Sequence, residues 1–153
     1  MRDYRVRQLG AGDVAAMEAL NTVFGDAFGE PDTYGDAPPG RAYLEKLLAR
    51  DHFIALAAFD GDAVIGGLVA YVLDKFERAR SEIYIYDLAV MEAYRRRGIS
   101  IALIGELQRI GAARGAYVIF VQADYGDDPA IALYTGLGTR EDVLHFDIAV
   151  PGA

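Results

Sequence analysis

Two long apolar runs, residues 53–59 and 63–73, are separated only by Asp60, Gly61 and Asp62. A glycine between two aspartates indicates a tight hairpin turn, so the two runs are predicted to be neighbouring antiparallel strands. A third run, residues 82–90, is rich in Ile, Tyr and Val and is also typical of a strand. The middle of the chain is therefore expected to form a sheet.

Helical patterns stand on both sides of this hairpin. Asp13 is a suitable N-cap for a helix that runs to about Phe24, and a second helix is predicted over residues 41–50. A third follows over residues 98–113, where Gly115 ends it. The stretch between the first two helices, from Gly25 to Gly40, is rich in Gly, Pro and acids and is expected to be an active-site loop.

The remaining segments complete a mixed architecture. Residues 116–123 are nearly all apolar, as expected of a strand buried on both faces. Asp128 and Pro129 are the expected N-cap and first residue of a short helix through Thr135. Strands are predicted over residues 4–8 and 144–150. Hairpins combined with crossovers imply an α/β (α+β) fold, a mixed sheet with helices on its faces.

Composition limits the function classes. A chain of 153 residues with 53% hydrophobic residues suits one domain over residues 1–153. The net charge of -8 disfavours nucleic acid and anionic membranes and favours a cationic small molecule. The absence of cysteine excludes disulfides, thiolate metal sites and a cysteine acyl-enzyme, and two histidines make a metal site unexpected. Neither a signal peptide nor a membrane-spanning run is evident, so we expect a cytoplasmic protein.

The most informative stretch is residues 86–100, in which a strand leads through a short loop into a helix. Backbone N–H groups at a helix start lack internal partners and lie at the positive end of the helix dipole. A pyrophosphate fits there, and Gly98 would let the backbone approach it. The residues expected to bind it are Arg95, Arg96, Arg97, Gly98, Ile99 and Ser100. An ordinary strand-to-helix turn and a basic nucleic-acid patch are the alternatives, and the acidic remainder of the chain argues against the second.

Two sequence blocks resemble the GNAT superfamily of N-acetyltransferases. Arg95-x-x-Gly98-x-Ser100 is similar to its acetyl-CoA signature, with Ser in place of the usual Gly or Ala. About 30 residues later, residues 127–138 resemble the family block Asn-x-x-Ala-x-x-x-Tyr-x-x-x-Gly, with Asp127 in place of Asn and Tyr134 as its tyrosine. The resemblance implies a GNAT fold, a mostly antiparallel mixed sheet of six to seven strands that is splayed at the acetyl-CoA site.

Within this superfamily the chain most resembles the class I aminoglycoside 3-N-acetyltransferases of the gentamicin-resistance type. The similar stretches are residues 53–90, 115–129 and 145–148. This resemblance implies direct transfer of an acetyl group from acetyl-CoA to an amine of a 2-deoxystreptamine antibiotic, which confers resistance. It also implies a homodimer, although no residue pattern selects an interface.

The resemblance implies roles for particular residues. Tyr134 is expected to give a proton to the departing thiolate, and Asp127 to contact the pantetheine arm. The backbone of Leu88, Ala89 and Val90 is expected to pair with that arm and to supply the oxyanion site. Packing is the alternative role for Tyr134 and for the side chains of Leu88, Ala89 and Val90.

A base or a chain of water molecules must remove a proton from the ammonium group of the acceptor before the amine attacks. Asp124 is the first choice, because it follows a buried strand, and Glu82, Asp87 and Asp147 are the other candidates. An acidic wall for a polycationic drug would comprise Asp124, Asp127 and Asp128, with Glu30 and Asp32 closing over it. The acceptor-site candidates are Tyr84, Tyr86, Asp87, Asp124, Asp128, Asp147, Glu30 and Asp32.

The sequence therefore leaves three functions open. The leading one is an aminoglycoside acetyltransferase, and the second is the same fold acting on a protein N-terminus, a polyamine or another small amine. The third is a CoA-binding domain without turnover. A long acidic loop suits any cationic acceptor and does not separate a drug from a polyamine.

Overall fold

The computed structural model describes residues 3–152. The chain divides into two compact units, and the boundary in the sequence follows Gln122. The second unit contains α5 (Asp128–Thr135). The first unit contains β1 (Arg5–Gln8), α1 (Val14–Ala27), α2 (Pro31–Gly35), α3 (Arg41–Leu48), β2 (Phe53–Asp60), β3 (Ala63–Asp74), β4 (Ser81–Val90), the 3₁₀ turn η1 (Glu92–Tyr94), α4 (Ile99–Ala113) and β5 (Ala116–Val121).

The five strands of the first unit form one sheet in the order β1-β2-β3-β4-β5. All neighbours are antiparallel except β4 and β5, which are parallel and joined through α4. The predicted hairpin is confirmed, because Asp60 of β2 pairs with Ala63 of β3 and Gly61 has a positive φ of 58°. The mixed sheet predicted from hairpins and crossovers is therefore present.

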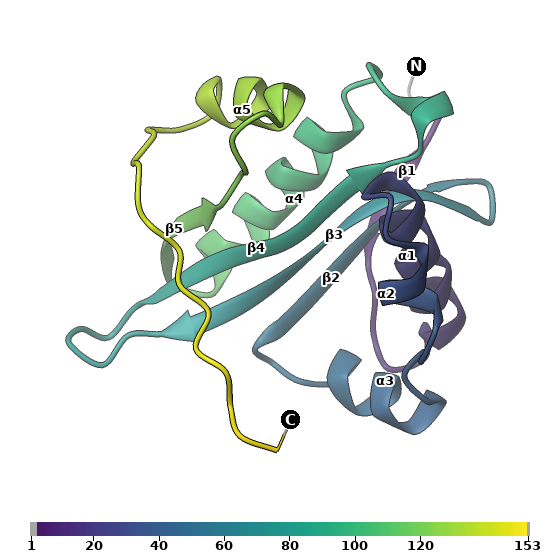
Figure 1. Cartoon of the computed structure of the whole chain (residues 1–153), viewed down its shortest axis with the longest axis horizontal. Helices are drawn as coiled ribbons and strands as arrows, with labels where there is room; N and C mark the ends of the chain where they lie inside the picture. Colours follow the sequence, from purple (N-terminus) through teal and green to yellow (C-terminus); the bar gives the residue numbers. More distant parts are fainter. Residues whose placement is uncertain (1–2, 153) are drawn as a thin grey trace. The chain divides into compact units, whose positions relative to one another are not determined.

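Helices cover both faces of this sheet (Figure 1). Alternate residues of β2, from Phe53 to Phe59, belong to one core cluster with α1 and α3 side chains that include Leu20, Phe24 and Leu44. The residues between them in β2 are equally buried, on the opposite face, where α4 contacts the sheet. Because both faces of β2 are covered, it is apolar throughout, as the sequence indicated.

A β-bulge in β4 decides which side chains point to which face. Asp87 pairs with Val69 of β3, but Ile85 pairs with the next residue, Ala70, so Tyr86 is an extra residue without a partner. A bulge interrupts the alternation of side chains between the two faces. Unbroken alternation would give Asp87 the same face as the buried Ile85. The bulge instead turns Asp87 toward α2, where the Tyr34 hydroxyl contacts its carboxylate.

Two sequence predictions about strands are wrong. The run that begins at Ala116 is an edge strand that pairs with β4 alone, and Tyr117 and Val118 are 48% and 40% exposed. Residues 144–150 form no strand, because no segment among the described residues pairs with them, and their apolar side chains are exposed. Alternating apolar residues favour a strand but cannot supply the partner that a strand needs. The sheet therefore has five strands rather than six or seven.

Two local predictions also need correction. The N-cap of α5 is Asp127 rather than Asp128, because the Asp127 carboxylate accepts a hydrogen bond from the Ala130 N–H at 3.4 Å. Capping favours the residue whose oxygen reaches an N–H three positions later. The predicted loop between Gly25 and Gly40 also contains the five-residue helix α2. The other helices and strands begin and end within a few residues of their predicted bounds.

The approach of α1 to β3 requires a glycine, and this gives a stability prediction. A Cβ on Gly67 would lie 2.6 Å from Leu20 Cδ1 and would also meet the backbone oxygen of Leu56. Because the backbone cannot move away easily, Gly67→Ala is expected to destabilise the protein by about 1–3 kcal/mol. Urea denaturation should show a lower midpoint.

The matched control is Gly105→Ala on the exposed side of α4, where nothing lies within 4 Å of the added Cβ. Alanine in a helix interior should raise stability by about 0.5–1 kcal/mol over glycine. A Gly67→Ala protein as stable as the unmodified chain would contradict the close helix–sheet contact.

Candidate functional site

The turn between η1 and α4 combines two left-handed residues. Arg96 has a φ of 63° and is the one non-glycine residue with a positive φ in the described part of the chain. Gly98 has a φ of 78° and precedes the first residue of α4. Open space surrounds the position of its Cβ, so within the protein it is the backbone conformation that requires glycine. Turns of this kind gather N–H groups into a concavity that suits an anion.

The start of α4 adds further donors to this turn. The first helical hydrogen bond runs from the Ala102 N–H to the Gly98 oxygen at 3.0 Å. The N–H groups of Ile99, Ser100 and Ile101 therefore have no acceptor within the helix. A helix of 15 residues also places the positive end of its dipole here. The turn therefore has the free N–H groups and the positive potential that the predicted anion site needs, and Ser100 is small enough not to obstruct it.

β4 extends beyond its parallel neighbour, as Figure 1 shows. Pairing with β5 ends at Ile85, whereas β4 continues to Val90. The Met91 N–H donates to the Ile65 oxygen of β3 at 2.8 Å. Because backbone groups alternate along a strand, those of Leu88 and Val90 point to the open side. The predicted splay is present, and it leaves an edge to which an amide-bearing chain can hydrogen-bond.

Side chains hold the turn against the sheet. The Arg95 Nε donates to the Val90 oxygen at 3.2 Å, so Arg95 ties the turn to the end of β4. The Tyr94 hydroxyl donates to the Asp60 carboxylate at 2.7 Å, and the Arg97 guanidinium lies 5.1 Å from the centre of the Tyr94 ring. Of the three arginines, Arg95 therefore has a demonstrable positioning role.

Asp87 is a half-buried carboxylate on the face covered by α1 and α2. The Tyr34 hydroxyl of α2 donates to its Oδ2 at 2.8 Å. Burial raises the pKa of Asp87 above its ordinary value, the Tyr34 hydrogen bond opposes that rise, and the charge of Glu30 adds to it. A carboxylate with a raised pKa is better matched to proton transfer near neutral pH.

Aromatic rings form a row on the same face as Asp87. Tyr86 contacts Tyr71 and Tyr84 edge-on, with ring centres 5.9 and 5.8 Å apart, and Tyr84 stacks on Phe120 at 4.7 Å. Tyr86 is 63% exposed and Tyr71 37%. The row can therefore accept a cation or the apolar face of a sugar ring. Its position confirms that Tyr84 and Tyr86 lie on one side of β4.

The other sequence candidates of the first unit are placed differently. Glu30 is exposed but close enough to act on Asp87 through its charge, and Asp32 is an exposed residue of α2. Glu82 accepts from the Tyr117 hydroxyl at 2.7 Å and pairs with Lys75 at 3.3 Å. These partners lower the pKa of Glu82, the Tyr117 hydrogen bond most strongly, which makes it a poor base.

In the second unit, Tyr134 lies near the end of α5 and Asp127 at its start. Burial, and then the charge of Asp127, raise the pKa of Tyr134, which keeps its hydroxyl protonated and able to donate. Asp124 and Asp128 are exposed. Asp147, also exposed, pairs with His145 at 2.9 Å in an irregular segment rather than in the strand predicted for it.

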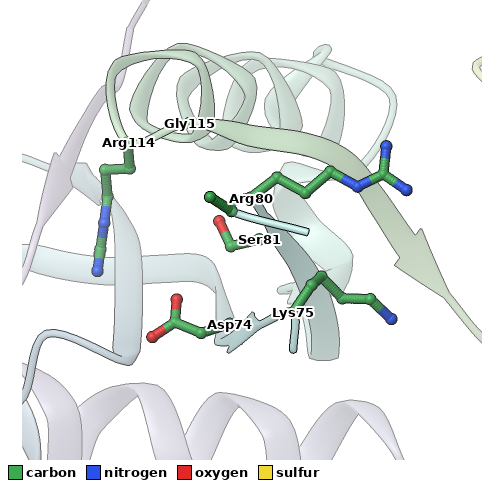
Figure 2. Close-up of a pocket in the computed structure, with 7 residues that line it drawn as sticks. Asp74, Lys75, Arg80, Ser81, Arg114 and Gly115 are labelled. Carbon is green, nitrogen blue, oxygen red and sulfur yellow. The ribbon is translucent and has the colours of Figure 1, made fainter. Parts of the chain in front are cut away.

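One hollow beside the sheet lies apart from both the turn before α4 and Asp87. This hollow, of about 300 Å³, lies at the start of β4, where Figure 2 shows the Lys75 and Arg80 side chains pointing away from Ser81 and Asp74. It is roughly 30 Å along β4 from Val90, at about 3.3 Å per residue. Lys75 pairs with glutamates, Arg80 lies over the Tyr117 ring, and Arg114 donates to the Asp51 oxygen. Arg80 Nε is buried without a hydrogen-bond partner among the described residues.

The sequence analysis did not identify two residues that lie beside Asp87 and Tyr86. Tyr34 lies in the loop-like stretch, where no periodicity marks it. Tyr71 is the paired residue of Tyr84 across β3 and β4, and the hairpin register could have placed it. The bulge in β4 had no sequence signal.

Comparison with known proteins decides the family. Residues 17–139 match the acetyltransferase (GNAT) family. The chain belongs to this family. Its five-stranded sheet and helices form the GNAT fold, and the family uses acetyl-CoA. The predicted class of enzyme, an N-acetyltransferase, is therefore confirmed.

Similar structures carry the comparison further. An aminoglycoside acetyltransferase from an uncultured soil metagenomic sample is 58% identical, covers 98% of this chain and 99% of its own, and has a TM-score of 0.95. A second such enzyme from a soil metagenomic sample, in complex with sisomicin, is 29% identical over 96% of both chains with a TM-score of 0.89. An N-alpha-acetyltransferase of Sulfurisphaera tokodaii is 24% identical over 92% of this chain and 82% of its own.

No helix between residues 3 and 152 is both long enough and apolar enough to cross a membrane. The localisation predicted from the sequence, the homodimer and the single domain stay predictions.

The left-handed backbone at the turn gives a second prediction. Gly98→Ala should weaken the binding of coenzyme A roughly tenfold, because a left-handed alanine costs about 1–2 kcal/mol and the turn would relax to another conformation. Isothermal titration calorimetry measures the affinity.

Gly61→Ala is the matched control, since Gly61 also has a positive φ with open space around its Cβ but lies in the β2–β3 turn. Both variants should lose similar stability, and only Gly98→Ala should lose affinity. Equal affinity in the two variants would remove the turn from the binding site.

Proposed function

We propose that this chain binds acetyl-CoA and transfers the acetyl group to an amine of an aminoglycoside, at the 3-amino group of 2-deoxystreptamine in a gentamicin-like drug. One observation carries this proposal. A half-buried carboxylate, Asp87, lies among aromatic hydroxyls on the same strand that offers a free backbone edge and leads into the anion-binding turn. Donor and acceptor sites then meet on β4.

The donor side fits acetyl-CoA by the chemistry of its groups. Pyrophosphate oxygens need several N–H donors and positive charge, which residues 96–101 supply at the start of α4. The pantetheine arm carries amides, which match the open backbone groups of Leu88 and the N–H of Val90, whose oxygen already accepts from Arg95. Asp127 replaces the asparagine of the family block, and its carboxylate already caps α5. We therefore assign Asp127 a capping role first.

The acceptor side fits a polycationic sugar. The row formed by Tyr71, Tyr84 and Tyr86 presents ring faces and edges, and Asp87 with Glu30 supplies negative charge. Ring faces attract ammonium groups as well as the apolar faces of sugars. The net charge of -8 draws such a molecule toward the protein. The soil enzymes named above, one of them bound to sisomicin, support an aminoglycoside over other amines.

Each residue then has a chemical task. Acetyl-CoA supplies a thioester carbonyl carbon for the amine to attack. Asp87 takes a proton from the acceptor ammonium, which frees the nitrogen lone pair. Open N–H groups of β4 stabilise negative charge on the carbonyl oxygen. Tyr134, whose raised pKa keeps it protonated, is assigned the donation of a proton to the leaving sulfur on the family resemblance.

We rank Asp87 above Asp124 as the base, which revises the order taken from the sequence. Asp124 is exposed and begins a turn in which its backbone oxygen accepts from the Asp127 N–H at 3.2 Å. Nothing described around Asp124 gives its carboxylate a fixed direction. Asp87 has both a fixed direction and a raised pKa. Asp124, Asp128, Asp147 and Asp32 are assigned at most to the attraction of the cationic acceptor.

An acceptor panel tests the function. Free-thiol release from acetyl-CoA should be fastest with gentamicin and sisomicin, since both present several ammonium groups on a compact ring system. Spermidine and peptides with free N-termini are the comparison amines. NMR of the product should place the acetyl group on the 3-amino group.

Each other result selects a different function. Release with peptides alone would assign the chain to N-terminal acetylation, for which the Sulfurisphaera relative is the precedent. Coenzyme A binding without release for any amine would indicate a binding domain. Acetylation at another amino group of the drug would keep the substrate class and overturn the assigned position.

A pair of aspartate variants tests the base. Asp87→Asn should lower kcat at pH 7 by about 10²- to 10⁴-fold, the usual contribution of a positioned base. Asp124→Asn should change kcat by less than roughly tenfold, because exposed charges contribute little. Steady-state kinetics with gentamicin measures both.

Affinity for coenzyme A, which does not need a base, should be unchanged in both proteins and serves as the test of folding. The reverse pattern, with Asp124→Asn the damaging change, would restore Asp124 as the base.

A further inference from the structure

We propose that Tyr34 is a positioning residue for the transfer reaction, whose hydroxyl holds the Asp87 carboxylate ionised and aimed at the acceptor amine. This inference rests on the proposed function for its meaning in catalysis. The contact itself, from the Tyr34 hydroxyl to Asp87 Oδ2 at 2.8 Å, is a feature of the protein alone.

Tyr34 is held firmly although α2 is short. Its ring lies against Phe24 and Phe28, with ring centres 6.2 and 6.1 Å away, and Phe24 is a buried core residue of α1. Gly25 permits this approach, because a Cβ there would lie 3.2 Å from the Tyr34 Cβ. The Glu30 N–H also donates to the Gly25 oxygen at 2.9 Å, which closes the loop between α1 and α2. These contacts therefore fix the position of the Tyr34 hydroxyl.

Asp87 has no cationic partner within residues 3–152. Burial and the charge of Glu30 both oppose its ionisation, and the Tyr34 hydrogen bond favours it. The other titratable groups that face this cluster are Tyr71 of β3 and Tyr84 and Tyr86 of β4. Among them Tyr84 already donates to the Gln122 side chain at 3.0 Å. Tyr34 is thus the group that stabilises the charge of Asp87.

The hydrogen bond also restricts the direction of the carboxylate. With Oδ2 accepting from Tyr34, the other oxygen, Oδ1, is left for a second donor. On the open, aromatic side of β4 that donor would be the ammonium group of the acceptor. A base is effective only when its oxygen lies within hydrogen-bond reach of the proton that it removes. Tyr34 would fix that oxygen before the acceptor arrives.

A purely structural role for Tyr34 is the competing explanation, in which its hydroxyl merely joins α2 to β4. The two roles differ in their pH dependence. If Tyr34 stabilises the Asp87 carboxylate, its loss raises the pKa of Asp87, and the base is lost as the pH falls. A structural role would change turnover equally at all pH values.

The test compares Tyr34→Phe with the unmodified protein, since phenylalanine keeps the ring and removes only the hydroxyl. The ratio of kcat/KM, variant to unmodified, is measured with gentamicin from pH 5.5 to 8.5. The ionisation of the drug cancels in this ratio. We expect the ratio to be roughly threefold to tenfold lower at the acid end than at the alkaline end, where the remaining loss reports the direction of the carboxylate. A ratio that is flat with pH would overturn the proposal.

Tyr117→Phe is the matched control, because it removes another tyrosine–carboxylate hydrogen bond, of 2.7 Å to Glu82, far from the assigned site. Its ratio should stay near one at every pH. Tyr34→Leu removes the ring as well and should lower thermal stability, whereas Tyr34→Phe should not lose more than the hydrogen bond. This separates the packing of α2 from the action of the hydroxyl.

Carbon-13 NMR titration of the free protein provides a readout without turnover. The Asp87 carboxyl resonance, identified by its loss in Asp87→Asn, should titrate at higher pH in Tyr34→Phe than in the unmodified protein. An unchanged titration would overturn the proposal even if the drug is a substrate. Conversely, a shifted titration in a protein that acetylates no aminoglycoside would leave the Tyr34–Asp87 coupling in place and overturn the proposed function alone.

Discussion

The bulge at Tyr86 is the constraint on which the proposed site depends. Pairing between β4 and β5 ends at Ile85, and the extra residue follows immediately. The end of the ladder opens one edge of β4, and the bulge turns Asp87 to the face covered by α1 and α2. Two adjacent features of β4, the end of its pairing with β5 and the bulge in its pairing with β3, thus produce a free backbone edge and a directed carboxylate. Bulges beside active sites commonly re-aim a side chain in this way.

Charge is distributed along β4 in the order that the proposed chemistry requires. Beyond Val90, Arg96, Gly98 and the open amides of α4 offer positive potential to a pyrophosphate. A few residues earlier, Asp87 and Glu30 offer negative charge to an ammonium group. The low polarity around Asp87 makes its ionisation costly, and one tyrosine hydroxyl offsets part of that cost. The proposed function therefore places an anionic donor and a cationic acceptor on one strand of an acidic protein.

The short helix α2 shows why the contact between Tyr34 and Asp87 was hard to predict. It has five residues and no buried side chain, so neither periodicity nor composition marks it as structured. Its position comes from the Phe24 and Phe28 rings of α1 and from the room that Gly25 leaves. Tyr34 could not be chosen in advance, since its partner lies 53 residues away. The apolar run from Ala116 was predicted to be buried on both faces, and this was wrong for a similar reason. An edge strand and a central strand can have the same composition.

The features that could be predicted from the amino-acid sequence are local ones. The spacing of Arg95, Gly98 and Ser100 at the end of a strand predicted an anion-binding turn, and the Asp60–Asp62 turn predicted the hairpin. Both depend on backbone conformations that neighbouring residues impose. The tertiary structure alone decided which face Asp87 occupies, that Tyr34 reaches it, and that β5 is the edge of the sheet. Those features depend on pairing register and on contacts between distant segments, which no local pattern encodes.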